Sequence, residues 1–290
     1  MIEQVVVTDA WVEHEGTVFL NPALKTYELG LLRMKQAWEK GADVSPLSWY
    51  AQQADIKPAT LLTHLYPDLP QNVKQCWVAS PYHAQLSRSS LRVLPDTMLD
   101  WTASMGQQLC EILNPLLTED GLKLCLVGEV LLLTSEHKWD VVCEDFAYIS
   151  GKTLPDRQQG GQDMGRWLRL LSEIQMTLHS HPIHTAQGLQ IHGLWMWGDV
   201  IGQQKLDVQL LPNVASKNIY LNSVLQALHK QQDATVIVSE AEHLPSLLPT
   251  VLPEQWLLLG TGKSVSLKNN MLTSALSRVS KPKWKGTGVL

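Results

Sequence analysis

Hydrophobic and polar positions repeat with two different periods along this chain, and the clearest helical period begins at residue 163. Apolar residues at helical spacings form a single stripe there: Trp167, Leu171, Ile174 and Leu178. Asp163 is a suitable N-cap for this helix because its carboxylate can accept hydrogen bonds from backbone N–H groups. Pro182 cannot continue a helix and disfavours helical angles at His181, so the helix is predicted to end at residues 179–181.

A strand is predicted over residues 191–198, whose sequence is IHGLWMWG. Period-two alternation places Trp195 and Trp197 on one face of this strand and apolar residues on the other. Apolar residues on both faces indicate a strand that is buried on both sides, as in a sheet covered by helices. Gly198 is expected to end the strand. The tryptophan pair is more typical of a core than of a platform on which a ligand stacks.

The same two periods predict the remaining elements. Strands are expected at residues 2–8, 76–79, 91–94, 122–134, 139–143, 234–238, 256–259 and 264–267. Helices are expected at residues 21–40, 45–55, 97–117 and 218–230. Two pairs of strands are expected to form hairpins that turn at residues 135–138 and 260–263. Residues 57–72 and 150–163 are rich in turn-forming and polar residues, and they are expected to be connecting segments.

The alternation of strands and helices predicts an α/β fold with a mixed sheet flanked by helices. The N-terminal strand and the strand that contains Trp195 are expected at the centre of this sheet. Residues 1–75 and 151–290 are expected to form the two parts of the α/β core. Residues 76–150 are expected to form a subdomain of α+β character.

Composition and charge exclude several classes of protein. The chain has 290 residues, of which 44% are hydrophobic, so it can bury a sizeable core. Its net charge is −5, and it shows no basic face of the kind that nucleic-acid binding requires. No apolar run is long enough for a membrane span and no signal pattern is present, so a cytoplasmic protein without membrane or nucleic-acid partners is expected. The four cysteines form no C-x-x-C motif and are expected to be buried thiols in a reducing compartment.

Histidines at the junction of the predicted helix and strand are the main candidates for chemistry: His179, His181, His184 and His192. Imidazoles can ligate a metal or transfer protons near neutral pH. The spacing of these residues matches no zinc signature, and an imidazole near a helix end is also a favourable capping group. No catalytic residue, metal or cofactor is therefore assigned. The ligand-binding candidates of this junction are Glu173, Gln175, His179, His181, His184, His192, Trp195 and Trp197.

Two blocks of sequence resemble the RpfE-type regulatory proteins of bacteria. The first resembles that family's W-x-x-A-D-P-V-H-L-x-x-D-R-D-x-L stretch through Trp77, Ala79, Pro81, His83, Leu86, Arg88 and Leu91. The second resembles its N-E-I-Q-M-x-L-H-x-H-P segment and W-x-W-G motif through Glu173, Ile174, Gln175, Met176, Leu178, His179, His181, Pro182, Trp195, Trp197 and Gly198. The chain departs from the family at His184 and His192, where the family has asparagine, and at Asp199-Val200, where it has glycine.

The second block is also distantly similar to cofactor-independent phosphoglycerate mutases, which belong to the alkaline phosphatase superfamily. The shared positions are Pro182, Gly193, Trp195, Trp197 and Gly198. This resemblance implies a reduced form of the phosphoglycerate mutase α/β fold. Enzymes of that family need two divalent metals held by Asp and His clusters, together with a serine nucleophile. Here Asp9 stands alone after the first strand, and residues 238–243 hold acids and one histidine outside the family's pattern, so the resemblance implies shared architecture more than a shared reaction.

Three functional hypotheses remain open. The first is a non-catalytic binding or regulatory protein, whose partner is an unknown small molecule or protein. A phosphorylated metabolite bound at the junction of residues 179–197 is one form of it. The second is an active metal-dependent phosphomutase or phosphatase, which requires these residues to meet: Asp9, Asp145, His243, and His179 or His181. The third is a protein–protein interaction module. Such a module would expose a contiguous apolar patch well above the area of roughly a few hundred Å² that is usual on monomers.

Overall fold

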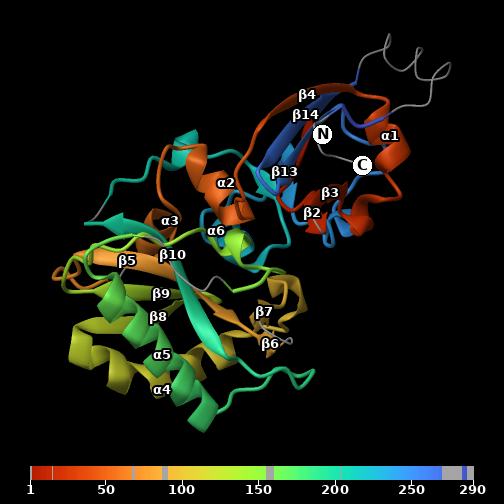
Figure 1. Ribbon diagram of the computed structural model, residues 1–290. Coiled ribbons are helices and arrows are strands. Elements are labelled where there is room, and N and C mark those ends of the chain that lie inside the picture. Colours follow the sequence, from red (N-terminus) through yellow and green to blue (C-terminus); the bar gives the residue numbers. More distant parts are fainter. Residues whose placement is uncertain are drawn as a thin grey trace. The chain divides into compact units, whose positions relative to one another are not determined.

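The structure is a computed structural model that describes residues 2–14, 16–66, 69–86, 91–154, 160–202, 204–269 and 283–285. The chain divides into two compact units, both visible in Figure 1. Unit 1 consists of Met1–Trp49 and Leu211–Leu290, and unit 2 consists of Tyr50–Leu210. These boundaries differ from residues 75 and 150, the division points expected from the sequence.

Unit 1 is built on a six-stranded mixed sheet with the strand order β11-β12-β1-β13-β14-β4. Its strands are β1 (Gln4–Val7), β4 (Lys35–Lys40), β11 (Val214–Ala215), β12 (Val236–Ser239), β13 (Gln255–Gly260) and β14 (Lys263–Lys268). The first four strands in this order are parallel, and β14 and β4 each run antiparallel to the strand before them. Val5, Val6 and Val7 are fully buried, as expected for an interior strand that is covered on both faces. The mixed α/β character predicted from the sequence is confirmed.

The described residues of unit 1 also form a hairpin, two helices and two 3-10 turns: β2 (Trp11–His14), β3 (Thr17–Leu20), η1 (Pro22–Leu24), α1 (Glu28–Leu32), α6 (Ile219–Ala227) and η6 (Leu244–Ser246). Helix α6 connects the parallel strands β11 and β12, which cannot be joined by a tight turn. Asn218 caps this helix, since its side chain accepts a hydrogen bond from the Leu221 N–H at 3.0 Å. Because β1 and β12 are parallel neighbours, the residues that follow them, Asp9 and Glu240, lie at the same edge of the sheet.

Unit 2 is built on a four-stranded antiparallel sheet with the order β10-β5-β9-β8. Its strands are β5 (Gln75–Tyr82), β8 (Leu122–Val127), β9 (Val130–Ser135) and β10 (Gly193–Ile201). Helices α4 (Ala103–Leu117) and α5 (Met164–Ser180) cover one face, and α3 (Pro58–Leu65) lies on the other (Figure 1). The remaining elements are α2 (Pro46–Gln52), which crosses the boundary between the units, β6 (Ala84–Leu86), β7 (Leu91–Val93), η2 (Asp96–Met98), η3 (Thr118–Asp120), η4 (Phe146–Tyr148) and η5 (Val208–Leu210).

Tryptophan residues dominate the core between this sheet and its two helices. The ring centroids of Trp77 in β5 and Trp167 in α5 are 5.0 Å apart, and Trp139 packs edge-on against Trp167 at 5.3 Å. The guanidinium of Arg166 covers the Trp139 ring at 4.5 Å. None of the four cysteines forms a disulfide; three are buried, as expected from the sequence, whereas Cys143 is only partly buried.

Several predicted elements are confirmed. Helix α5 ends at Ser180, inside the predicted range, and β13 and β14 form the predicted hairpin. Strand β10 is buried on both faces from Gly193 to Trp197. Asp163 stands at the predicted N-cap position of α5, but the predicted capping hydrogen bond to its side chain is not formed. The side chain accepts a hydrogen bond from the Asp140 N–H at 2.8 Å instead.

The helix predicted over residues 21–40 is wrong. The segment forms only the short helix α1 and then the edge strand β4, in which exposed and partly buried residues alternate. Leu24, Leu31 and Trp38 do pack toward the core of unit 1, but Trp38 does so from a strand. A spacing of seven residues fits one face of a helix, but the helix ends at Leu32 and pairing with β14 makes the segment that holds Trp38 a strand.

Prolines account for two further differences. Strand β5 is longer than predicted, because it runs through Pro81 to Tyr82. The pairing of β5 with β9 ends at Ala79, so Pro81 has a neighbouring strand, β10, on one side only. The N–H that proline lacks is therefore not needed for a hydrogen bond to β9. The predicted connector at residues 57–72 contains α3, which begins at Pro58, and proline is favoured in the first turn of a helix.

Three predictions about strand ends and order are also wrong. Strand β10 does not end at Gly198; it continues to Ile201 after a bulge. Gly198 has a φ of +61°, and a Cβ there would lie 2.8 Å from Pro58, so both the backbone and the packing require glycine. Strand β10 is the edge of the sheet in unit 2 and does not share a sheet with β1. The hairpin predicted to turn at residues 135–138 is not formed, because residues 139–143 form no strand. The strand predicted over residues 122–134 is instead a hairpin of β8 and β9.

Part of the predicted linker, residues 155–159, lies outside the described residues, as does Arg88 of the first resembling block. No helix in the described part of the chain combines the length and the apolar character that crossing a bilayer requires.

Candidate functional site

The loop between α5 and β10 is anchored by two buried isoleucines and a side-chain bond. Ile183 and Ile191 belong to the core of unit 2, and the Ile191 N–H donates to the Ile183 carbonyl at 2.9 Å. Gln190 Nε2 donates to the Leu178 carbonyl at 3.4 Å, which ties the loop to the last turn of α5. The histidines before and after this loop are therefore held at the same end of the helix.

Two imidazoles of this region are in direct contact. His83 follows β5 and His192 precedes β10, and their rings lie edge to face with centroids 4.6 Å apart. His192 Nδ1 accepts a hydrogen bond from the Ala84 N–H at 3.2 Å, so the proton of the neutral ring is assigned to Nε2. His83 Nδ1 lies 2.8 Å from the Gln190 carbonyl oxygen, so this nitrogen is assigned the proton and donates it.

Two more imidazoles act on His192 through space. Burial lowers the pKa of His192, and the imidazoles of His83, His179 and His184 lower this pKa further. His179 and His184 are exposed, whereas His192 is partly buried. Among the described residues, the ionisable groups that shift His192 are all imidazoles, so no carboxylate there balances a proton on its ring. We call His83, His179, His184 and His192 the histidine cluster.

A hydroxyl and an amide form a polar pair beside the cluster. Gln175 Nε2 donates to the Tyr82 hydroxyl oxygen at 2.7 Å, and Tyr82 immediately precedes His83. Burial raises the pKa of Tyr82, and the hydrogen bond from Gln175 offsets part of this shift. Gly193 follows His192, and a Cβ at Gly193 would lie 2.5 Å from the Tyr82 hydroxyl. Glycine at this position therefore lets the tyrosine reach its partner.

The structure gathers four of the residues predicted from the sequence: Gln175, His179, His184 and His192. Glu173 instead forms a 3.5 Å ion pair with Arg169 on the outer side of α5. His181 lies at the C-cap of α5, where its Nδ1 is 3.4 Å from the Thr177 carbonyl oxygen. These two candidates contribute to the end and surface of the helix.

Trp195 and Trp197 are core residues. Their exposed fractions are 3% and 0%, and their indole N–H groups donate to the Glu144 carbonyl at 2.9 Å and to Ser80 Oγ at 2.8 Å. Buried rings whose polar atoms are satisfied leave no open face for a ligand to stack on. They fix the strand that leads into the histidine cluster.

Sequence reasoning missed His83 and Tyr82 as site residues. A signal was present, because Pro81-Tyr82-His83 directly follows a buried strand. What brings them to His192 is the antiparallel pairing of β5 with β10, in which Tyr82 lies opposite Gly193. This register joins residues more than a hundred positions apart in the sequence.

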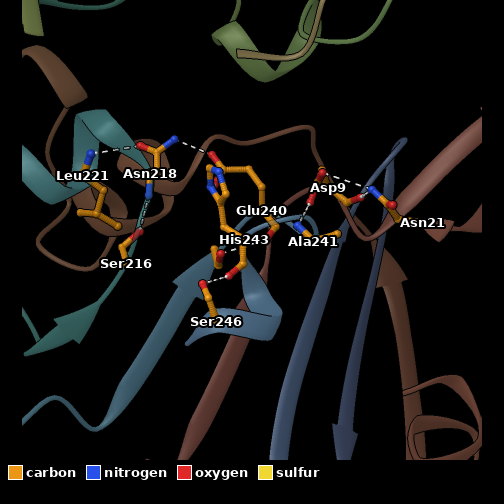
Figure 2. A network of polar contacts seen from close by, with 10 residues as sticks. Asp9, Asn21, Ser216, Asn218, Leu221, Glu240, Ala241, His243 and Ser246 are labelled. Atoms are coloured by element: carbon orange, nitrogen blue, oxygen red, sulfur yellow. Dashed lines mark hydrogen bonds and ion pairs between the residues drawn. The ribbon is translucent and has the colours of Figure 1, made fainter. Parts of the chain in front are cut away.

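A second polar network lies in unit 1, at the carboxyl ends of the parallel strands β1 and β12 (Figure 2). Asp9 follows β1, and its Oδ1 accepts a hydrogen bond from the Ala241 N–H at 2.6 Å. Its Oδ2 accepts a hydrogen bond from Asn21 Nδ2 at 3.2 Å, and the same amide donates to the Asp9 carbonyl at 3.0 Å. Asp9 is thus bound to groups from two other segments of unit 1.

Glu240 extends this network from the end of β12. Its Oε1 accepts a hydrogen bond from Asn218 Nδ2, the residue that caps α6. Its Oε2 is buried and lies 3.6 Å from His243 Nδ1, beyond hydrogen-bond distance. Figure 2 shows that Glu240 stands between Asn218 and the segment that holds Asp9.

This network changes the acidity of Asp9. Burial raises the pKa of Asp9 to about 7, and the nearby carboxylates of Glu240 and Glu242 add to the increase. Asp9 can therefore keep a proton close to neutral pH. Within the part of the chain that the structure describes, no group of three or more His, Cys, Asp or Glu residues is placed to hold a metal ion. Of the residues that the metal-dependent hypothesis requires, Asp9 and His243 belong to unit 1, and Asp145, His179 and His181 belong to unit 2.

The fold and the site define a mixed α/β protein with a histidine cluster in one unit and a buried carboxyl network in the other. No protein-family model and no curated protein matches the chain. Among solved structures, a cofactor-independent phosphoglycerate mutase from Thermoplasma acidophilum DSM 1728 is similar with a TM-score of 0.34 and 11% identity, over 95% of each chain. A similarity this weak does not establish a family, so the proposals below rest on the geometry of the chain.

Proposed function

We propose that this chain is a non-catalytic binding protein, RpfE-like and with a reduced phosphoglycerate-mutase-like architecture, that holds a small phosphorylated metabolite at the histidine cluster. The observation that carries the proposal is the convergence of four imidazoles at the junction of α5, β5 and β10. Among the described residues, the ionisable groups that act on His192 are all basic ones. Such a cluster of basic groups favours a negatively charged ligand.

The electrostatics of the cluster couple binding to protonation. Burial and the imidazoles of His83, His179 and His184 oppose a proton on His192, so the pKa of His192 lies below its usual range in the free protein. A phosphate group carries a charge of about −1.5 to −2 at neutral pH and would reverse this balance. The pKa of His192 would rise on binding, and the protein would take up protons with its ligand.

The polar pair beside the cluster supports the same class of ligand. The Tyr82 hydroxyl already accepts a hydrogen bond from Gln175, so its own proton is directed elsewhere. A hydroxyl donor on the residue before His83 is suited to a phosphate or carboxylate oxygen. The non-catalytic part of the proposal is supported by the sequence, which contains an incomplete form of the metal-binding pattern of the resembling enzymes. We further propose a regulatory role in the cytoplasm, because the quoted residues resemble RpfE-type proteins.

Calorimetric titration with inorganic phosphate and with 3-phosphoglycerate tests the proposal. We expect saturable binding at pH 6.5, with a heat that differs between two buffers of unequal ionisation enthalpy because protons are taken up. His192→Asn and His83→Asn are each expected to weaken binding by about tenfold or more, the effect of losing one hydrogen bond to a charged group. The matched control is His229→Asn, because His229 is exposed in unit 1 and asparagine tolerates its left-handed φ of 54°.

Two results would overturn the proposal. One is the absence of saturable heat with either ligand in a folded protein. The other is binding that neither His83→Asn nor His192→Asn weakens. Phosphoglycerate mutase and phosphomonoesterase assays with added manganese test the non-catalytic part separately. Turnover that disappears in Asp9→Ala or His243→Ala would show that the protein is an enzyme.

A further inference from the structure

A short C-terminal segment, Lys283–Lys285, lies against the aromatic face of unit 1. The Trp284 ring packs edge-on against Trp11, with centroids 5.1 Å apart and an interplanar angle of 88°. It also meets Trp38 of β4 at 6.2 Å and 88°. Trp11 and Trp38 contact each other at 5.2 Å, so they form a two-ring wall that the third ring closes.

The polar atom of Trp284 has a specific partner. Its Nε1 donates to Glu28 Oε1 at 3.2 Å, and the Glu28 side chain is only 18% exposed. The other oxygen of this carboxylate is held by Lys25 Nζ at 2.7 Å. The carboxylate is therefore fixed in place, with one oxygen directed to the lysine and the other to the indole. This arrangement selects tryptophan over an aromatic ring that has no N–H group.

The main chain on both sides of Trp284 is bound by a single amide. Gln36 Nε2 donates to the Lys283 carbonyl at 3.0 Å, and Gln36 Oε1 accepts from the Lys285 N–H at 2.9 Å. A residue in a parallel sheet binds its neighbour in the same way, through the carbonyl before and the N–H after the opposite residue. The side chain of Gln36 thus replaces a strand, and it requires the bound segment to be extended.

The amide of Gln36 is oriented before any segment arrives. Trp38 Nε1 donates to Gln36 Oε1 at 3.0 Å, which fixes the carbonyl side of the amide and leaves the NH₂ group directed at the carbonyl of the segment. Gln36 and Trp38 point to the same face because they are two positions apart in β4. The lysine side chains of the segment are exposed, so the contacts involve the tryptophan and the main chain.

We propose that Trp11, Glu28, Gln36 and Trp38 form a peptide-binding site, the tryptophan site, which the chain's own Lys283–Lys285 occupies as an intramolecular ligand. The partner that fits it is an extended protein segment carrying one tryptophan. Three independent features specify that ligand: an aromatic wall, a fixed carboxylate for the indole N–H, and an amide that binds the main chain. The tail competes with the partner and must leave before the partner binds.

Fluorescence anisotropy on the 290-residue chain tests this inference. The probe is a labelled peptide with the sequence KPKWKG, which corresponds to residues 281–286. Trp284→Ala vacates the site in the chain, and we expect this variant to bind the peptide at least about tenfold more tightly than the wild type, since a tethered ligand competes at roughly millimolar effective concentration. A peptide with alanine in place of its tryptophan is expected not to bind.

Variants in β4 separate recognition from general stability. Adding Gln36→Ala to Trp284→Ala removes both main-chain bonds and is expected to weaken peptide binding by about fivefold or more. The matched control is Lys35→Ala in the same background, because Lys35 is exposed and points to the opposite face of the strand. Lys285→Pro keeps Trp284 but removes the N–H that donates to Gln36, so it is expected to bind the peptide more tightly than the wild type does.

The inference is overturned if folded Trp284→Ala does not bind the peptide at millimolar concentration. It is also overturned if this variant and the wild type bind equally, or if the alanine peptide binds as well as the tryptophan peptide. If Trp284→Ala does not fold, Lys285→Pro decides the question, and unchanged binding in that variant refutes the intramolecular competition.

Discussion

Replacing Asp9 by asparagine is expected to remove the pH dependence that the Asp9 carboxyl gives to the stability of unit 1. Burial, with help from Glu240, raises the pKa of Asp9 from 3.8 to about 7. In the folded state the group therefore keeps its proton over a range in which the unfolded chain has lost it. A group with a raised native pKa contributes stability that is complete below its unfolded pKa and is lost as the pH rises through its folded pKa.

The magnitude follows from the size of the shift. A shift of about three pH units, at about 1.4 kcal/mol each, corresponds to about 4 kcal/mol. Relative to the Asp9→Asn variant, the wild type is expected to lose this free energy of unfolding between pH 4 and pH 8. The variant also loses one of the two side-chain bonds of Asp9, at a cost of about 1 kcal/mol that does not depend on pH.

Urea unfolding at a series of pH values measures this difference. A hydrogen-exchange pulse under fixed conditions, analysed on peptides from β1 and β12, follows unit 1 separately from unit 2. Asp233→Asn is the matched control, because Asp233 is an exposed residue of unit 1 whose left-handed φ of 52° suits asparagine. If the difference between wild type and Asp9→Asn stays constant within about 1 kcal/mol from pH 4.5 to 8, Asp9 does not hold its proton as argued.

Three further predictions concern the acidity of Asp9, the packing of Tyr82 and the burial of Cys76. Glu240→Gln removes a charge that raises the pKa of Asp9, so the Asp9 carboxyl followed by carbon-13 NMR is expected to titrate at lower pH; an unchanged midpoint would contradict the electrostatic link. Gly193→Ala places a methyl group 2.5 Å from the Tyr82 hydroxyl and is expected to cost about 1–3 kcal/mol in chemical denaturation, whereas a neutral effect would mean that the tyrosine can move aside. Burial raises the pKa of Cys76 to about 12, so its modification by a maleimide at pH 8 is expected to be slow until urea unfolds the chain; rapid labelling of the native protein would argue against that burial.

Local pattern accounts for the elements that were predicted correctly. The end of α5 follows from Pro182, which constrains the residue before it whatever the rest of the chain does. The burial of β10 on both faces follows from the alternation of Trp195 and Trp197 with apolar residues. The hairpin β13–β14 follows from its glycine-containing turn at residues 260–263.

The errors occur where a distant partner decides the local structure. Trp38 lies in a strand because β14 pairs with it, although its spacing from Leu31 also fits a helix. Pro81 is tolerated in β5 because the neighbouring strand β9 has already ended. In both cases the sequence around the residue is compatible with two structures, and the pairing partner lies far away in the chain.

The sequence by itself determined the candidate residues at the end of α5 and the α/β character of the chain. Only the tertiary structure brought His83 to His192, Asp9 to the Ala241 N–H across 232 positions, and Gln36 to the main chain beside Trp284. The physical reason is that periodicity reports which face of an element is buried, whereas a site needs polar atoms within about 3 Å of each other. That proximity is set by strand order and register, which depend on the packing of the whole unit.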